Sequence, residues 1–483
     1  MKKTLVISSL IYKTVERFSV KGLGFIIGIL LARLLSPEAY GQIAIINVFV
    51  NLSQSIIEGG LGTALVQNKD TDDRDYSTVF FICMAMSLVM TSIVFIAAPF
   101  IANYYSSPEI LMPLRVYAFS VFFSSYGSIL TAKIQREMRF KQMLICSLAA
   151  TVISGSLAVA LAFSGAGIWT LVVYYFSHTV VNCMAMMIAV RWAPRLSFSV
   201  SRAKILYSFG WKMLAASMMC SLYYDLRSLI IGKRFSTEDL GYYDRGQQFP
   251  FTIHFALDAS IQSVMFPVLA KSQDSRDEMR SIMRKTLGLG AVMVLPAMMG
   301  LAAVAEPLIR LLLTDKWLPC VPFMQIICIA QVPGFIISSN LVAIKSSGRS
   351  DIYMKLEFLR RIVMLAVLAL TVLLFDSVIA MAYSYALSTW MDLVIVIVSN
   401  KKLIGYSLSE QMKDVWPAVM PTVIMTALVY ALNYVPLPLA LKLCVQILGG
   451  MLAYIVFCKL FKVKMFNYAL DMLKDMLSKK KAA

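Results

Sequence analysis

Charged residues are scarce in this chain: they make up 15% of its 483 residues, whereas 59% of the residues are hydrophobic. A water-soluble domain cannot hide that much apolar surface in its core, so a soluble globular protein is excluded. Histidine is scarcer still, with two residues, and the eight cysteines are scattered singly. Because zinc sites need clustered His and Cys, and disulfide frameworks need paired Cys spacings, we expect no metal site and no disulfide framework.

Long apolar segments account for the composition. A membrane-spanning helix needs about 20 mostly apolar residues, and about fourteen such segments can be marked along the chain. Residues 77–102 form the clearest one. The start, MKKTLVISSLIYKT, has the basic edge of a signal peptide, but charge resumes at Lys13 and no cleavage site of small residues follows. We therefore expect a retained first helix in an all-α polytopic membrane protein of about fourteen transmembrane helices.

The net charge of +18 has a topological explanation. Lys and Arg gather in alternate loops, as in residues 133–141, 191–204 and 271–285, and in the tail after Lys459. The intervening loops have almost none, so the positive-inside rule predicts that both termini are cytoplasmic. We expect no nucleic-acid partner. The amphipathic basic tail, residues 461–483, is expected to lie on the cytoplasmic membrane surface against anionic lipid.

A short corner of the sequence occurs twice. Residues 30–41 read LLARLLSPEAYG, and residues 229–241 read LIIGKRFSTEDLG. At an offset of 200 residues, Gly41 aligns with Gly241. A serine cap followed by a glycine or proline turn is typical of a sharp reversal between two helices. We therefore expect the corner residues to end one helix and begin the next, and to do no chemistry.

This repeat predicts the domain organisation. Both copies begin with a helix that runs from the cytoplasm to the outside, so the halves form a parallel repeat, and transporters of that symmetry hold their substrate between the halves. We predict an N-terminal six-helix bundle, a C-terminal six-helix bundle, helices 13 and 14, and the cytoplasmic tail, at residues 1–200, 201–400, 401–460 and 461–483. We expect alternating access to a central cavity, the first bundle rocking against the second.

Ionisable residues inside apolar segments are costly and usually face a cavity or a partner. In the first helix, Lys13, Arg17 and Lys21 are spaced four apart and form one stripe of cations. We expect Lys13 to reach the headgroups and Arg17 and Lys21 to line a cavity; the alternative is that all three snorkel to the cytoplasmic headgroups. Cations outnumber anions at this depth, which favours an anionic solute such as a lipid-linked diphosphate. Further charged residues at membrane depth are Arg115, Lys212, Asp225, Arg227, Glu357, Arg360, Arg361 and Asp392.

Two segments carry polar stripes at helical spacing. They are the second segment and its counterpart at the offset of the repeat, with Asn51, Gln54 and Glu58 in one and His254, Asp258 and Gln262 in the other. Such a stripe indicates a helix face that avoids lipid. We expect these residues to line the cavity or to couple transport to an ion, H⁺ or Na⁺; the alternative is interhelical hydrogen bonding. No other cofactor and no catalytic residue is predicted.

Four stretches of the chain resemble those of the Wzx-type polysaccharide flippases: LLARLLSPEAYG, AKIQREMRFKQM, DLRSLIIGKRFSTEDLGYYDRGQQFP and VMFPVLAKSQD. These flippases are the polysaccharide transporter branch of the multidrug/oligosaccharidyl-lipid/polysaccharide (MOP) exporter superfamily, and the stretches look most like those of its colanic-acid exporter group. The resemblance covers essentially the whole chain. It implies two six-helix bundles around a cavity that opens alternately inward and outward, with two extra helices.

The resemblance also implies an activity. Such a flippase moves an undecaprenyl-diphosphate-linked oligosaccharide repeat unit from the inner to the outer leaflet of the bacterial inner membrane, for O-antigen, lipopolysaccharide or exopolysaccharide export. Cavity cations that bind the diphosphate headgroup are a family theme, which here falls on Arg17, Lys21, Lys212 and Arg227. The implied partners are the lipid-linked oligosaccharide and membrane lipids, and a polysaccharide polymerase is left open. Ion coupling is implied without a choice between H⁺ and Na⁺.

Two other functions stay open as alternatives. A drug or cation antiporter of the same superfamily should show carboxylates and aromatic residues around its cavity, whereas the first helix offers cations. A membrane polymerase or glycosyltransferase is suggested by TDDRD, residues 71–75, because Asp-Arg-Asp looks like a sugar-nucleotide metal site. However, no nucleotide-binding domain surrounds it, no large outside loop is present, and acidic residues before a helix are ordinary partners of its dipole. We therefore do not expect an enzyme.

Overall fold

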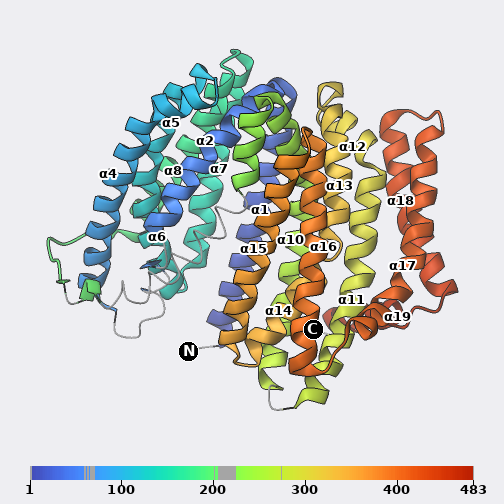
Figure 1. The fold of residues 1–483 in the computed structure, drawn as a ribbon. Helices are drawn as coiled ribbons and strands as arrows, with labels where there is room; N and C mark the ends of the chain where they lie inside the picture. The colour runs from blue at the N-terminus through green and yellow to red at the C-terminus, as the bar shows by residue number, and fades with distance from the viewer. Residues whose placement is uncertain are drawn as a thin grey trace. The chain divides into compact units, whose positions relative to one another are not determined.

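All regular secondary structure in the described part of the chain is helical (Figure 1). The computed structural model describes residues 3–58, 61–62, 65, 71–200, 202–204, 225–272 and 275–481. Within these ranges, 10 helical runs are long and apolar enough to cross a bilayer. The predicted all-α membrane fold is confirmed, and the predicted number of helices stays a prediction.

The helices form two compact units, residues 1–241 and 242–483. The predicted division at residues 200, 400 and 460 is drawn from the repeat and not from contacts, and it stays a prediction. The elements of the first unit are α1 (Lys3–Leu34), α2 (Pro37–Glu58), α4 (Asp73–Tyr104), η1 (Pro108–Ile110), α5 (Leu111–Ala118), α6 (Ser120–Arg136), α7 (Phe140–Phe163), α8 (Ile168–Val190), a helix over residues 225–234 and the first turn of α10 (Thr237–Lys271).

Within the first unit, α2 contacts α4, α6 and α8, while α7 packs along both α1 and α8. The contact of α1 with α7 is close, because a Cβ atom built on Gly155 would lie 2.3 Å from Cδ1 of Ile27. Since α2, α6 and α8 also contact one another, the polar stripe of α2 can share a face with residues of α6 and α8.

The second unit consists of the rest of α10 and the elements that follow it. These are α11 (Arg276–Ala303), α12 (Ala305–Leu312), η2 (Asp315–Cys320), α13 (Val321–Gln331), α14 (Gly334–Ser346), α15 (Ser350–Leu374), α16 (Val378–Ile404), α17 (Leu408–Ala431), η3 (Leu432–Tyr434), α18 (Leu439–Leu460) and α19 (Lys464–Lys481). α17 packs along α11 on one side and α18 on the other, and α19 contacts both α11 and α18 (Figure 1).

A buried amide cluster joins α17 to the body of the second unit. Asn340 on α14 and Gln411 on α17 exchange two hydrogen bonds, with Nδ2 to Oε1 at 2.9 Å and Nε2 to Oδ1 at 3.1 Å. Asn400 on α16 donates to the same Asn340 oxygen at 2.6 Å. All three side chains are 0% exposed. Because buried amides are costly without partners, this cluster fixes α17 against α14 and α16.

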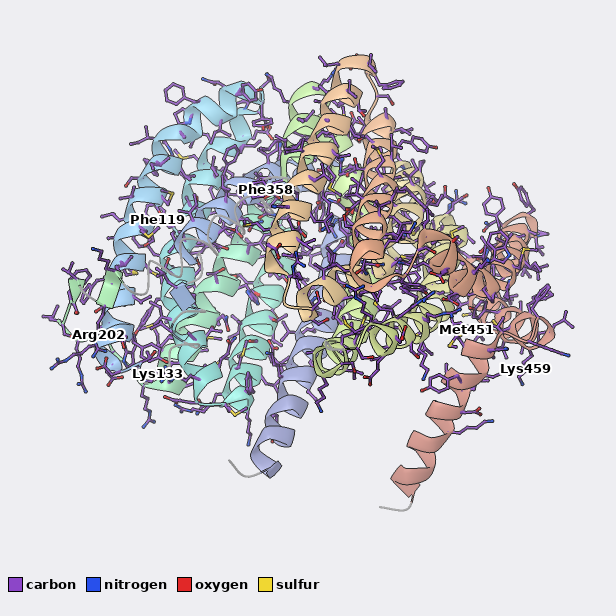
Figure 2. The ribbon with its side chains drawn as sticks, turned by 60° about the horizontal axis from the view of Figure 1, so that its bottom comes forward. Phe119, Lys133, Arg202, Phe358, Met451 and Lys459 are labelled. Atoms are coloured by element: carbon purple, nitrogen blue, oxygen red, sulfur yellow. The ribbon has the colours of Figure 1, made fainter. Side chains whose placement is uncertain are left out.

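Large apolar side chains are exposed on helices of both units. Phe119 in the first unit is 46% exposed, and Phe358 and Met451 in the second are 50% and 59% exposed (Figure 2). Exposure of many such side chains over long helices is what a surface in contact with lipid requires.

The two copies of the corner have the same local structure. Helix breaks at residues 35–36 and 235–236 separate α1 from α2 and the helix over residues 225–234 from α10. In each break a serine caps the next helix: Ser36 Oγ accepts from the backbone N–H three residues later at 3.3 Å, and Ser236 Oγ does so at 3.0 Å. The predicted role of the corner, to end one helix and begin the next, is confirmed.

The first turns of α2 and α10 cross in direct backbone contact. A Cβ atom built on Gly41 would lie 1.6 Å from the carbonyl oxygen of Thr237, and one built on Gly241 would lie 2.0 Å from that of Pro37. Thr237 and Pro37 are themselves related by the offset of the repeat, so the contact is reciprocal. Neither glycine can carry a side chain in this arrangement, which explains why glycine closes both copies of the corner.

Candidate functional site

Four charged residues at membrane depth in the second unit are paired with one another. Arg360 on α15 forms a bidentate pair with Asp392 on α16, from Nε to Oδ1 and from Nη2 to Oδ2, the latter at 2.6 Å. Its Nη1 donates to Glu357 Oε1 at 2.6 Å, and Arg361 lies 3.6 Å from the other oxygen of Glu357. The Arg360 and Asp392 side chains are 8% and 3% exposed. This cluster joins α15 to α16, and its two positive and two negative charges neutralise one another.

The polar stripe of α10 is brought together with α14. Asp258, which is 9% exposed, accepts hydrogen bonds from Ser338 Oγ on α14 and from Nε2 of Gln262 one turn along α10. His254, one turn earlier, is 6% exposed, and its Nδ1 has no hydrogen-bond partner among the described residues. The His254 ring lies against Gly334, where a Cβ atom would approach its Cε1 to 2.3 Å. A buried carboxylate and an imidazole therefore lie side by side.

In the first unit, a cavity of about 500 Å³ opens between α2, α6 and α8. Its volume is within the range of about 300–1,000 Å³ that is typical of small-ligand sites. Gln54, a predicted site residue, lines it from α2. The polar side chains that complete the lining are Ser124, Ser128, Thr131 and Gln135 on α6 and His178, Thr179 and Asn182 on α8. We name this feature the α2/α6/α8 cavity.

The four predicted headgroup cations do not line the α2/α6/α8 cavity as far as the structure describes it. Lys21 is exposed on α1, and the side chain of Arg17 lies outside the described part of the chain. Lys212 also lies outside the described residues. Arg227, in the helix over residues 225–234, is buried with 4% exposure. Their role in binding a diphosphate stays a prediction.

The α2 stripe is divided between different surroundings. Gln54 faces the α2/α6/α8 cavity, whereas Asn51 is exposed, and the side chain of Glu58 lies outside the described part. The α6 and α8 residues were not predicted from the sequence, because neither segment carries a carboxylate within its polar stripe, as the two recognised stripes do with Glu58 and Asp258. The signal was present in residues 124–135, SSYGSILTAKIQ, where Ser, Thr and Gln recur every three or four positions along one helix face.

The Asp-Arg-Asp sequence forms the start of α4. Asp72 Oδ1 accepts from the backbone N–H groups of Arg74 and Asp75 at 2.9 and 3.0 Å, and Asp75 Oδ2 accepts from the N–H of Asp72 at 3.0 Å, which makes a capping box. Arg202 bridges the Asp72 and Asp75 carboxylates at 2.9 and 2.8 Å. Burial acts to raise the pKa of Asp72, but the Asp75 N–H and the Arg202 charge together hold it below its usual value.

The remaining carboxylate of residues 71–75, Asp73, pairs with Lys133 at 3.2 Å and lies 3.6 Å from Arg195. Lys133 and Arg202 accordingly lie at the same end of the first unit (Figure 2). In the described residues, no group of three or more His, Cys, Asp or Glu side chains is placed to hold a metal ion. The acidic sequence is thus engaged in helix capping and in ion pairs with basic loops.

Removing the buried carboxylate of this capping box should destabilise the protein measurably. Asp75→Ala removes the acceptor for the Asp72 N–H and one partner of Arg202, and the Asp75 side chain is 4% exposed. We expect a loss of about 1–2 kcal/mol, measured by thermal unfolding of the purified protein in detergent. Asp73→Ala is the matched control, because its pairs are partly exposed and should be worth less than about 1 kcal/mol. Equal losses in both variants would contradict the assignment.

The proteins to which this chain is similar are described as polysaccharide biosynthesis or transport proteins. Residues 30–322 match the family model described as "Polysaccharide biosynthesis protein". A succinoglycan biosynthesis transport protein, ExoT, of Rhizobium meliloti is 25% identical over 310 residues, which cover 64% of this chain and 63% of that protein. A lipopolysaccharide biosynthesis protein, WzxC, of Escherichia coli is 22% identical over 310 residues, with coverage of 64% and 63%. The matches thus span less than two thirds of these relatives.

Two solved structures share the fold. The lipid II flippase MurJ, in an inward closed conformation, matches with a TM-score of 0.78 at 14% identity, over 95% of this chain and 100% of that one. An inward-facing multidrug resistance transporter of the MATE family and MOP superfamily matches with a TM-score of 0.63 at 11% identity, over 82% and 98%. At these identities the likeness is one of fold. This likeness and the apolar helices described above together indicate that the chain is a multi-pass membrane protein.

Proposed function

The chain belongs to the polysaccharide biosynthesis protein family, and on that premise we propose that it is a transporter that flips a lipid-linked oligosaccharide. The cargo moves by alternating access from the inner to the outer leaflet of a bacterial inner membrane, with both termini of the protein in the cytoplasm, and no covalent chemistry is involved. The family match over residues 30–322 carries the proposal. The fold alone would not choose, because a lipid flippase and a multidrug transporter both share it.

The diphosphate of such a cargo needs cations, and we assign that role to Arg17, Lys21, Lys212 and Arg227. Support comes from the spacing of Arg17 and Lys21 on one face of α1 and from the burial of Arg227, which is 4% exposed. A buried guanidinium is well suited to a phosphate oxygen pair because its donors are fixed in a planar fork.

The test is export of surface polysaccharide in a flippase-deficient strain that carries this gene. Wild type should restore export, and the double variant Arg17→Ala/Lys21→Ala should lower it at least about 100-fold, because two charge-assisted hydrogen bonds of about 1.5–3 kcal/mol each are lost. Lys13→Ala is the control, since Lys13 lies 5.5 Å from the Phe140 ring and is assigned to the headgroup region. Equal membrane levels are confirmed by immunoblot. Normal export by the double variant would reject the headgroup assignment.

For the energy source we propose that a coupling ion, H⁺ or Na⁺, is taken up at Asp258. The support is the burial of this carboxylate beside His254 and its two neutral donors, Ser338 and Gln262. A carboxylate at membrane depth is costly without a cation beside it, which favours a bound coupling ion at Asp258.

This assignment can be tested in inverted membrane vesicles that contain the lipid-linked cargo. Dissipating the proton gradient or the Na⁺ gradient should slow wild-type transport in one case only, which identifies the ion. Asp258→Asn should be about tenfold slower, as expected for the loss of about 1.4 kcal/mol of coupling, and should ignore both gradients. Asp351→Asn, which removes an exposed carboxylate of the same unit, is the control. Retained gradient sensitivity in Asp258→Asn would place coupling elsewhere.

A further inference from the structure

In the part of the chain that the structure describes, the side chains lining the α2/α6/α8 cavity are polar or apolar but not charged. The polar groups of the cavity are hydroxyl, amide and imidazole groups and the Cys183 thiol, and none of the lining residues that the structure describes is a Lys, Arg, Asp or Glu. The remaining lining residues are Gly62, Phe123, Gly127 and Ala132. A cavity intended for an anionic headgroup would be expected to offer Arg or Lys. One intended for a cation would be expected to offer a carboxylate. The lining therefore fits a neutral ligand.

The hydroxyl groups of the lining offer acceptors and not donors. Each hydroxyl has one proton, and each gives it to a carbonyl oxygen of its own helix. The distances from oxygen to oxygen are 3.1 Å for Ser124, 2.9 Å for Ser128, 2.8 Å for Thr131 and 3.0 Å for Thr179. What these four groups still present to the cavity is lone pairs.

The imidazole and one amide add further acceptors. Thr151 Oγ1 donates to the Ser147 carbonyl oxygen at 2.8 Å and lies 3.4 Å from His178 Nε2, and the histidine tautomer with its proton on Nε2 satisfies both contacts. The neutral ring then has Nδ1 as an acceptor. The oxygen Oδ1 of Asn182 is buried and has no partner among the described residues. Among the lining residues that the structure describes, the side-chain donors left over are the amide groups of Gln54, Gln135 and Asn182 and the weak thiol donor of Cys183.

From this inventory we propose that the α2/α6/α8 cavity is a subsite for a neutral, hydroxyl-rich sugar residue of the cargo. The proposal rests on the proposed function and adds which part of the cargo is recognised in the first unit. Sugar hydroxyl groups bring the protons that the Ser, Thr, His and Asn acceptors lack. A diphosphate brings only further lone pairs and would face acceptors, so it is disfavoured here. Phe123, which is 36% exposed, offers its ring to the C–H face of a pyranose.

The experiment measures protection of the cavity in the full-length purified protein. Thr131→Cys serves as the reporter, and mass spectrometry follows its modification by a neutral maleimide. Two soluble probes are compared: the oligosaccharide obtained by depolymerising the host strain's exported polysaccharide, and inorganic pyrophosphate. We expect a saturating level of the oligosaccharide to slow modification about tenfold, because occupancy excludes the reagent. Pyrophosphate should leave the rate unchanged.

A matched pair of variants tests whether protection of the reporter cysteine depends on the hydroxyl acceptors of the cavity. In the reporter background, Ser124→Ala/Ser128→Ala should raise the half-protecting concentration about 5–10-fold, as expected for two neutral hydrogen bonds. Ser125→Ala is the control: it lies on the same helix, it is 0% exposed, and its hydroxyl also bonds to the Val121 carbonyl oxygen, but it does not line the cavity. Thermal unfolding checks that all variants are folded.

The outcomes separate the subsite from the proposed function. Protection by pyrophosphate, no protection by the oligosaccharide, or equal behaviour of the double variant and Ser125→Ala would each overturn the subsite. If the gene restores polysaccharide export while the oligosaccharide gives no protection, flipping stands and the subsite fails. If the oligosaccharide protects but export is not restored, the subsite is supported and flipping fails.

Discussion

Gly41→Val should strongly lower the proposed polysaccharide export while the protein still reaches the membrane. The added side chain would begin 1.6 Å from the Thr237 carbonyl oxygen, and because that atom belongs to the backbone of a capped helix, it cannot rotate away. The first turns of α2 and α10 must then separate. Overpacking of this kind typically costs about 1–3 kcal/mol, and about 1.4 kcal/mol corresponds to a factor of about ten in an equilibrium.

We therefore expect export to fall at least about tenfold in Gly41→Val, with Gly241→Val giving a similar loss because a Cβ atom there would meet Pro37 at 2.0 Å. Export is measured in the complementation strain at equal membrane levels. Gly28→Val on α1 is the matched control, since nothing lies within 4 Å of a Cβ atom at that position. Wild-type export by Gly41→Val would mean that transport does not require the two turns to touch.

Among the substitutions considered for their effect on folding, Asp392→Asn should lower the free energy of unfolding most. The substitution leaves the Arg360 guanidinium buried at 8% exposure with one of its two carboxylate partners neutralised. Breaking a buried pair by removing one partner costs about 3–5 kcal/mol; because Arg360 keeps its pair with Glu357, we expect a loss near the lower value, about 3 kcal/mol. The effect is measured as the shift of the unfolding transition of the purified protein in detergent.

Two further variants make this prediction specific. Asp351→Asn breaks an Asp–Arg pair whose side chains are 56% and 53% exposed, so it should cost less than about 1 kcal/mol. The double variant Arg360→Met/Asp392→Leu should recover most of the loss, because apolar side chains of similar volume can replace a buried pair. If Asp392→Asn unfolds like wild type, α15 and α16 are held together by apolar packing alone.

Local features of this protein were predictable because their causes lie within a few residues. The helix breaks and serine caps at Ser36 and Ser236 follow from residues adjacent in sequence. The apolar segments that make the chain a membrane protein are continuous and equally local.

Pairings between helices were not predictable, because they depend on how each helix is rotated about its axis. Arg360 and Asp392 were recognised as charges at membrane depth, but their sequence positions do not say that they face each other. The same is true of Ser338, which reaches Asp258 from another helix. The neutral cavity was missed for a different reason: back-bonded Ser and Thr are common in helices, so Ser124 or Thr131 carries no signal until α2 and α8 are placed beside it.

The reciprocal contact of Gly41 with Thr237 and of Gly241 with Pro37 is what a two-fold axis of a homodimer would show, where each residue meets the symmetry copy of its partner. In a homodimer, one substitution alters both sides at once. If the predicted repeat arose by duplication, each side of this contact can change separately, and both copies have kept the glycine that meets a carbonyl oxygen. Elsewhere the two halves of the repeat differ at equivalent positions. Gln54 faces the α2/α6/α8 cavity, whereas His254 lies beside the buried carboxylate of Asp258.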